Sequence, residues 1–140
     1  MTAQDRALTK VSIMLHEGFS PRRVVDTRGQ VIGYGWNLET GPAMTEPEAQ
    51  AILEDHVDAL ESAWLKAWPS FASCGGPQQR ALVEMSYQIG LGGVLLFAKM
   101  LRAIAVKDHE TAAHEVLNSN LAKQTPLRAR DYAATLRERE

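Results

Sequence analysis

The chain contains 140 residues, 45% of them hydrophobic and 23% charged, which fits one globular domain with a single core and excludes a disordered protein. Its formal net charge of -2 gives no general reason to expect nucleic acid or another polyanion as a partner. The one cysteine, Cys74, cannot form a disulfide within the chain and is interpreted as an incidental free thiol.

The N-terminal segment argues against a leader peptide. Asp5, Arg6 and Lys10 interrupt what would have to be an apolar run, so these residues do not form a secretory signal. No segment approaches the ~20 consecutive apolar residues that a membrane-spanning helix requires. The sequence therefore predicts no membrane span and a protein that stays in the cytoplasm until another component releases it.

A short helix followed by a hairpin is predicted at the start of the chain. Apolar residues recur at helical spacing over residues 5–16, and Gly18 ends the pattern. Residues 24–38 then read VVDTRGQVIGYGWNL, in which β-branched residues flank an Asp-x-x-Gly turn and glycines follow at alternate positions. These features predict a small β-hairpin.

The rest of the chain is predicted to be helical. Residues 45–48 read TEPE, a capping box with proline in the first turn, and they open a long helix that runs to about residue 68. Pro77 begins another helix, which stops at Gly90. Further helical patterns follow at residues 94–106, 108–118 and 126–138.

The stretch HETAAH superficially resembles a helical zinc motif. That motif needs two histidines four residues apart on one helix face, whereas His109 and His114 are five apart. Five residues separate them by about 140° around the helix axis, so they cannot share one ion. The sequence predicts no metal site and no cofactor.

Two carboxylates close to the predicted hairpin are candidate catalytic groups. Glu17 lies in the last turn of the first helix, where the negative end of the helix dipole and any burial would favour its protonated form. Asp26 lies in a turn, where solvent would keep it ionised. An acid and a base separated in this way suit the hydrolysis of glycosidic bonds, although a surface glutamate and a turn-forming aspartate explain the same spacing.

The order of the motifs resembles that of the phage-type lysozymes or endolysins, glycoside hydrolase family 24. The likeness begins with HEG, DTRG and VIGYG at residues 16–18, 26–29 and 31–35. It continues through NLETGPAMTEPEAQAILEDHVD, RALVEMSYQIG, Phe97 with MLRAI, and QTPLRAR. It covers nearly the whole chain.

The resemblance implies a mainly α (α+β), lysozyme-like fold that forms one domain, residues 1–140, with two lobes. A hairpin lobe of about residues 18–45 and a helical lobe of about residues 1–17 and 69–140 would be joined by an interlobe helix of about residues 46–68. It also implies a monomer that acts without metal or cofactor.

The implied activity is that of a muramidase, which hydrolyses the β-1,4 bond between N-acetylmuramic acid and N-acetylglucosamine in bacterial peptidoglycan for host lysis. The resemblance makes Glu17 the general acid, makes Asp26 the group that positions or activates water, and places Arg128 near the catalytic glutamate. Positions that match cleft-lining or sugar-contacting residues are Trp36, Asn37, Tyr87, Gln88 and Phe97. Trp36 fits equally well as a hydrophobic plug between hairpin and body.

One departure from the family pattern leaves the mechanism open. The family has a threonine before Ile-Gly that helps to hold the water, whereas this chain is one residue shorter there and has Val31 before Ile32. Three hypotheses remain: a weak hydrolase, an inactive homologue that binds glycan or protein, and a lytic transglycosylase.

Overall fold

The computed structural model describes residues 2–26 and 29–139 and is mainly helical, with one small antiparallel sheet. This confirms the predicted α+β class. The chain divides into two compact units, Met1–Glu48 and Ala49–Glu140. Within the described part of the chain, no helix combines the length and apolar character needed to cross a membrane.

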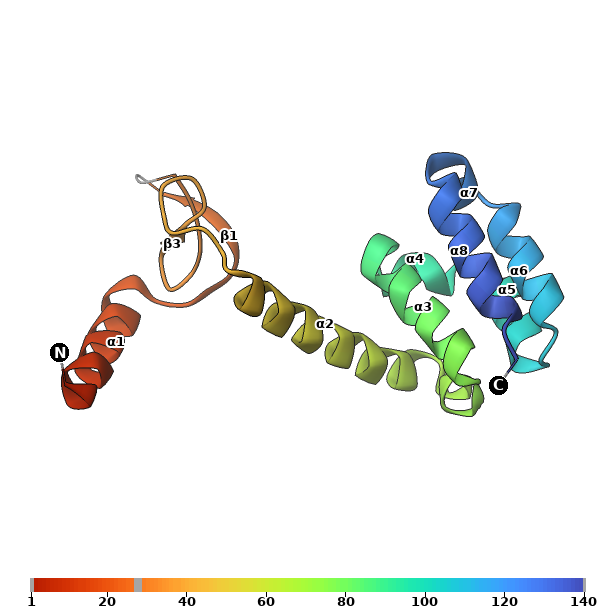
Figure 1. The fold of residues 1–140 in the computed structure, drawn as a ribbon, viewed down its shortest axis with the longest axis horizontal. Coiled ribbons are helices and arrows are strands. Elements are labelled where there is room, and N and C mark those ends of the chain that lie inside the picture. The colour runs from red at the N-terminus through yellow and green to blue at the C-terminus, as the bar shows by residue number, and fades with distance from the viewer. Residues whose placement is uncertain (1, 27–28, 140) are drawn as a thin grey trace. The chain divides into compact units, whose positions relative to one another are not determined.

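The first unit begins with α1 (Ala3–Glu17), which ends where the sequence predicts (Figure 1). Gly18 has a φ of 67°, a left-handed conformation that glycine adopts without a steric penalty, and its N–H donates to the Met14 carbonyl at 3.0 Å. The chain therefore leaves the helix directly after Glu17.

The predicted hairpin is a three-stranded sheet in the order β1-β2-β3, made of β1 (Ser20–Asp26), β2 (Gly29–Gly33) and β3 (Trp36–Asn37). Val31 of the central strand pairs with Val24 and with Asn37, and its side chain is only 4% exposed. The register shifts between Ser20 and Val24, because β1 has four residue steps there and β2 has two.

The second unit contains most of α2 (Glu46–Ala67), whose capping box is confirmed. The Thr45 N–H donates to Glu48 Oε1 at 3.0 Å, and the Glu48 N–H donates to Thr45 Oγ1 at 3.3 Å. The hydrogen bonds from Thr45 lower the pKa of the Glu48 carboxyl. The carboxylate therefore remains ionised at the positive end of the helix dipole.

Trp64 fixes the C-terminal part of α2 to the following elements, η1 (Pro69–Ser73) and α3 (Gly76–Ile89). Its buried ring stacks on Phe71 with 5.8 Å between centroids and 13° between planes. Its Nε1–H donates to Ser86 Oγ at 2.8 Å, and the Ser86 hydroxyl donates to the Leu82 carbonyl at 2.7 Å. Each polar atom in this contact is therefore satisfied.

Short helices complete the second unit: α4 (Leu91–Leu95), α5 (Ala98–Ala105), α6 (His109–Leu117), α7 (Asn120–Gln124) and α8 (Pro126–Arg137) (Figure 1). The single helix predicted at 94–106 is wrong, because a turn at Leu96 and Phe97 separates α4 from α5. The sequence also missed α7, which Ser119 caps by accepting a hydrogen bond from the Ala122 N–H.

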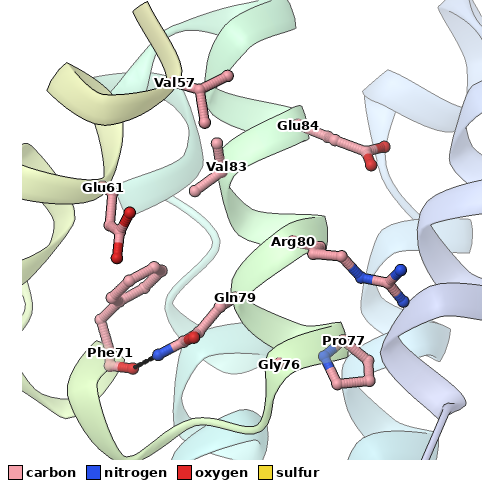
Figure 2. A pocket seen from close by; sticks show the side chains of 9 residues that line it. All are labelled: Val57, Glu61, Phe71, Gly76, Pro77, Gln79, Arg80, Val83 and Glu84. Carbon is pink, nitrogen blue, oxygen red and sulfur yellow. Dashed lines mark hydrogen bonds between the residues drawn. The ribbon is translucent and has the colours of Figure 1, made fainter. Parts of the chain in front are cut away.

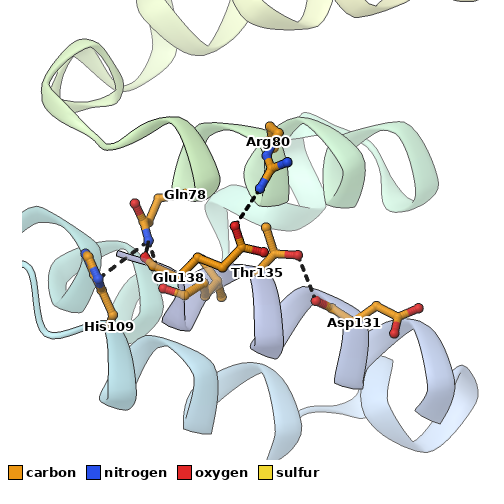
Figure 3. A network of polar contacts seen from close by, with 7 residues as sticks. Gln78, Arg80, His109, Asp131, Thr135 and Glu138 are labelled. Atoms are coloured by element: carbon orange, nitrogen blue, oxygen red, sulfur yellow. Dashed lines mark hydrogen bonds and ion pairs between the residues drawn. The ribbon is translucent and has the colours of Figure 1, made fainter. Parts of the chain in front are cut away.

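Gln78 ties the start of α3 to the end of α8 (Figure 3). Its buried Nε2 donates to the carbonyls of Leu136 at 2.8 Å and Glu138 at 2.9 Å. Both carbonyls lie at the C-terminal end of α8, where no following helical turn supplies an N–H to bind them. The Arg80–Glu138 ion pair, 2.8 Å long, reinforces the same junction at the surface.

We predict that Ser86→Ala lowers the free energy of unfolding by about 1–3 kcal/mol, because it leaves the buried Trp64 N–H without an acceptor. The matched control is Ser73→Ala, which removes an exposed hydroxyl that donates to the Ser70 carbonyl at 2.9 Å. That control should change the free energy by about 0.5 kcal/mol or less. Urea denaturation of the full chain measures both, and equal losses would contradict the assigned importance of Ser86.

Candidate active site

The Glu17 carboxyl lies directly against Gly35 in the turn that joins β2 to β3. A methyl group on the Gly35 α-carbon would place its carbon 2.5 Å from Glu17 Oε2 and 2.7 Å from Glu17 Cδ. Gly35 also has a φ of 73°, which disfavours any other residue. The end of α1 therefore contacts the sheet through the Glu17 carboxyl. Any residue larger than glycine at position 35 would collide with that carboxyl.

Asp26 is the last residue of β1 and pairs with Gly29 of β2. The turn predicted at DTRG joins these two positions, but Thr27 and Arg28 fall outside the described residues, as does the Asp26 side chain. The backbone therefore places Asp26 at the end of the β1–β2 pair, in the same unit as Glu17.

Trp36 and Asn37 hold the loop that follows β3. Trp36 Nε1–H donates to the Pro42 carbonyl at 2.9 Å, and Asn37 Oδ1 accepts from the N–H groups of Glu39 and Thr40 at 2.8 and 3.0 Å. A Cβ on Gly41 would lie 2.5 Å from the Asn37 carbonyl oxygen. Both half-buried side chains therefore have local structural roles, and their predicted contacts with sugar remain a prediction.

Val31, which is predicted to replace a threonine, is a packing residue. It is the most buried described side chain of the first unit and lies on the central strand of the sheet. An isopropyl group can neither donate nor accept a hydrogen bond, so this position cannot hold a water molecule.

Tyr87 and Phe97, both predicted to contact the substrate, border two different pockets of the second unit. Tyr87 borders a pocket of about 520 Å³ together with His56, and the centroids of the two rings are 6.2 Å apart. Phe97 borders a hollow of about 480 Å³ that also contains the cationic side chains of Lys99 and Arg102.

A larger pocket of about 610 Å³ lies between α2, η1 and α3 and is shown in Figure 2. Apolar side chains, including Val57, Phe71 and Val83, form much of its wall. Glu61, Arg80 and Glu84 contribute charged groups. It contains none of the predicted site residues.

Gln88 and Arg128 belong to one group of contacts around Tyr132. Gln88 Nε2 donates to Thr125 Oγ1 at 3.1 Å, and Gln88 Oε1 accepts from the Tyr132 hydroxyl at 2.7 Å. The Arg128 guanidinium carbon lies 5.9 Å from the centre of the Tyr132 ring. Burial raises the pKa of Tyr132, and the neighbouring Arg128 opposes that rise.

The structure thus groups the predicted site residues by unit. Glu17, Asp26, Trp36 and Asn37 belong to the first unit, and Tyr87, Gln88, Phe97 and Arg128 belong to the second. Among the residues described, no three His, Cys, Asp or Glu side chains are arranged to hold a metal ion.

Sequence reasoning missed two functional candidates, Gly35 and Tyr132. The alternate glycines at 33 and 35 were a signal for unusual backbone, but they did not reveal the contact with Glu17. The spacing of Arg128 and Tyr132, four residues apart in a helix, places them on one face and was a usable signal.

Comparison with protein families gives a match over most of the chain. The model of the phage lysozyme family matches residues 14–134, a range that includes every predicted site residue from Glu17 to Arg128. The matched range begins inside α1 and ends inside α8, so it extends through both units.

We predict that Gly35→Ala displaces the Glu17 carboxyl, whereas Gly33→Ala does not. Both glycines have left-handed backbone, with φ of 73° and 66°, so each substitution should cost about 1–2 kcal/mol of stability from strain. Only the Gly35 methyl meets Glu17, because nothing lies within 4 Å of a Cβ at Gly33. Carboxyl ¹³C NMR shifts of Glu17 should change in the first variant alone, and an equal change in both would contradict the contact.

Proposed function

The chain belongs to the phage lysozyme family, and from this premise we propose that it hydrolyses the β-1,4 bond between N-acetylmuramic acid and N-acetylglucosamine in peptidoglycan. The family supports a peptidoglycan hydrolase of the muramidase or endolysin type in general. The observation that supports Glu17 as the residue that acts is the packing of its carboxyl against Gly35.

Glu17 acts as the general acid in this proposal. It would protonate the glycosidic oxygen as the bond to the leaving sugar breaks. A general acid has to keep its carboxyl at one place relative to that oxygen. The close approach of Gly35 supports this, because it limits the positions open to the otherwise exposed Glu17 side chain.

Asp26, which lies at the end of the β1–β2 pair, would act as the base that orients the attacking water. In inverting glycosidases the water approaches the face of the sugar opposite the acid, and the two carboxyl groups stand roughly 6.5–9.5 Å apart to admit it. The position of Asp26 at a strand end supports the role, since its backbone is fixed by pairing with Gly29.

The remaining roles follow the family resemblance. Arg128 would supply a fixed positive charge to the reaction, and the sugar would contact Trp36, Asn37, Tyr87, Gln88 and Phe97. The biological role we propose is lysis of a bacterial host by a monomer that another component releases from the cytoplasm.

A lytic transglycosylase or a catalytically impaired glycan-binding homologue is the second candidate. Val31 favours this alternative, because it offers no hydroxyl to a water molecule and is buried in the sheet. A transglycosylase needs no such water, since a hydroxyl of the substrate itself attacks. A pure binding protein needs neither carboxylate.

We predict that Glu17→Gln lowers the rate of peptidoglycan hydrolysis by at least about 10²–10⁴-fold, because the amide cannot donate the proton. The variant should be no less stable than the wild type, since the side chain keeps its shape. Turbidity clearing with purified cell walls measures the rate. Glu54→Gln, an exposed change on α2, serves as the control for lost charge, and its rate should match the wild type. Clearing by Glu17→Gln at the wild-type rate would remove Glu17 from the mechanism.

We predict that the wild type releases fragments with reducing muramic acid ends and that Asp26→Asn loses this activity. Hydrolysis adds one water to each cut, so its products are heavier by one water than the anhydro ends of a transglycosylase. Mass spectrometry of digested peptidoglycan separates the two. Anhydro products that persist in Asp26→Asn would establish the transglycosylase instead. Intact glycan binding without any product would establish the binding protein.

A further inference from the structure

Hydrogen bonds run in one direction through the corner where α3, α7 and α8 meet. The Tyr132 hydroxyl donates to Gln88 Oε1 at 2.7 Å. Gln88 Nε2 donates to Thr125 Oγ1 at 3.1 Å, and the Thr125 hydroxyl donates to the Leu121 carbonyl at 3.2 Å. The Thr125 hydroxyl both accepts and donates.

The direction of this series is fixed at the Leu121 end. A backbone carbonyl can only accept a hydrogen bond, so the one Thr125 hydroxyl proton points to Leu121 and Thr125 Oγ1 accepts from Gln88. The orientation of the Gln88 amide follows, because its oxygen has to face Tyr132 and its nitrogen has to face Thr125. Hydrogen bonds that point the same way polarise and strengthen one another.

The ring of Tyr132 contacts Arg128. Its centre lies 5.9 Å from the guanidinium carbon, within the range of a cation–π interaction, and its hydroxyl is held by Gln88. The ring itself is buried in the core of the second unit, with 2% of the residue exposed. An exposed arginine therefore packs against a buried ring.

We propose that Tyr132, with its hydroxyl fixed by Gln88, is a positioning residue that holds the Arg128 guanidinium in one orientation for the reaction. The proposal rests on the proposed function, in which Arg128 supplies a positive charge. Within the described part of the chain, no carboxylate forms an ion pair with Arg128, so its charge is not neutralised by a local partner. A guanidinium that is already oriented loses less conformational freedom when an anionic group binds.

A double-mutant cycle tests whether Tyr132 acts through Arg128. Tyr132→Phe keeps the ring and removes the hydroxyl, and it should lower kcat/KM on peptidoglycan fragments by about twofold to tenfold. Tyr132→Leu removes the ring as well and should have the larger effect. In an Arg128→Ala background, Tyr132→Phe should change kcat/KM no further, because the group that it positions is gone. An undiminished effect in that background would overturn the proposal.

The matched control is Thr135→Val, which removes a different side-chain hydrogen bond of α8, the one from Thr135 Oγ1 to the Asp131 carbonyl at 3.0 Å. This variant should leave kcat and KM unchanged in both backgrounds. A loss equal to that of Tyr132→Phe would show that any weakening of α8 lowers the activity, and would overturn the proposal. Circular dichroism confirms that each variant is folded.

A measurement without substrate separates this proposal from the proposed function. ¹⁵N NMR of the Arg128 guanidinium reports rotation about its Nε–Cζ bond, which should be slower in the wild type than in Tyr132→Phe. Equal rotation rates in the two proteins would overturn the positioning role even if the enzyme is active. A wild type that does not hydrolyse peptidoglycan, but in which Tyr132→Phe speeds this rotation, would overturn the proposed function and leave the positioning of Arg128 supported.

Discussion

The hydrogen bond between the Trp64 indole and Ser86 is the contact on which the helical unit depends. Trp64 alone among the side chains of α2 is buried, so it carries the attachment of a long helix to η1 and α3. Burying an indole N–H without an acceptor would cost about 1–3 kcal/mol, and Ser86 removes that cost. Once α3 is fixed there, Gln78 and Gln88 can each reach α8 or its N-cap from the same helix.

Two charged groups proposed for the reaction are held by opposite means. The Glu17 carboxyl packs against the backbone of Gly35, where a larger residue would collide with it. The fit therefore depends on backbone geometry and on glycine at that position. Arg128 is confined by an added contact, the buried ring of Tyr132, whose hydroxyl is held by Gln88. The first arrangement fails when atoms are added, and the second fails when atoms are removed. Both keep a flexible side chain in place without burying its charge.

Local features of the fold could be predicted from the sequence, and contacts between distant segments could not. The end of α1 at Gly18 and the capping box at Thr45 follow from residues within one turn of each other. The register shift in β1 depends on its pairing with β2, and the contact of Gly35 with Glu17 depends on how the sheet returns to α1. The family resemblance supplied the candidate site, but it could not reveal that Tyr132, outside the quoted motifs, holds Arg128.

The hydrogen bonds of Gln78 and Gln88 join residues far apart in the sequence, and this has a consequence for synthesis. Gln88 pairs with a tyrosine 44 residues later, and Gln78 pairs with carbonyls 58 and 60 residues later. A nascent chain can form α3 early, yet it cannot close the helical unit until residues 132–138 have left the ribosome. Until then both amides remain open to water. The second unit therefore closes only after residue 138 has been made, and a chain cut short before residue 132 would lack the support for Arg128.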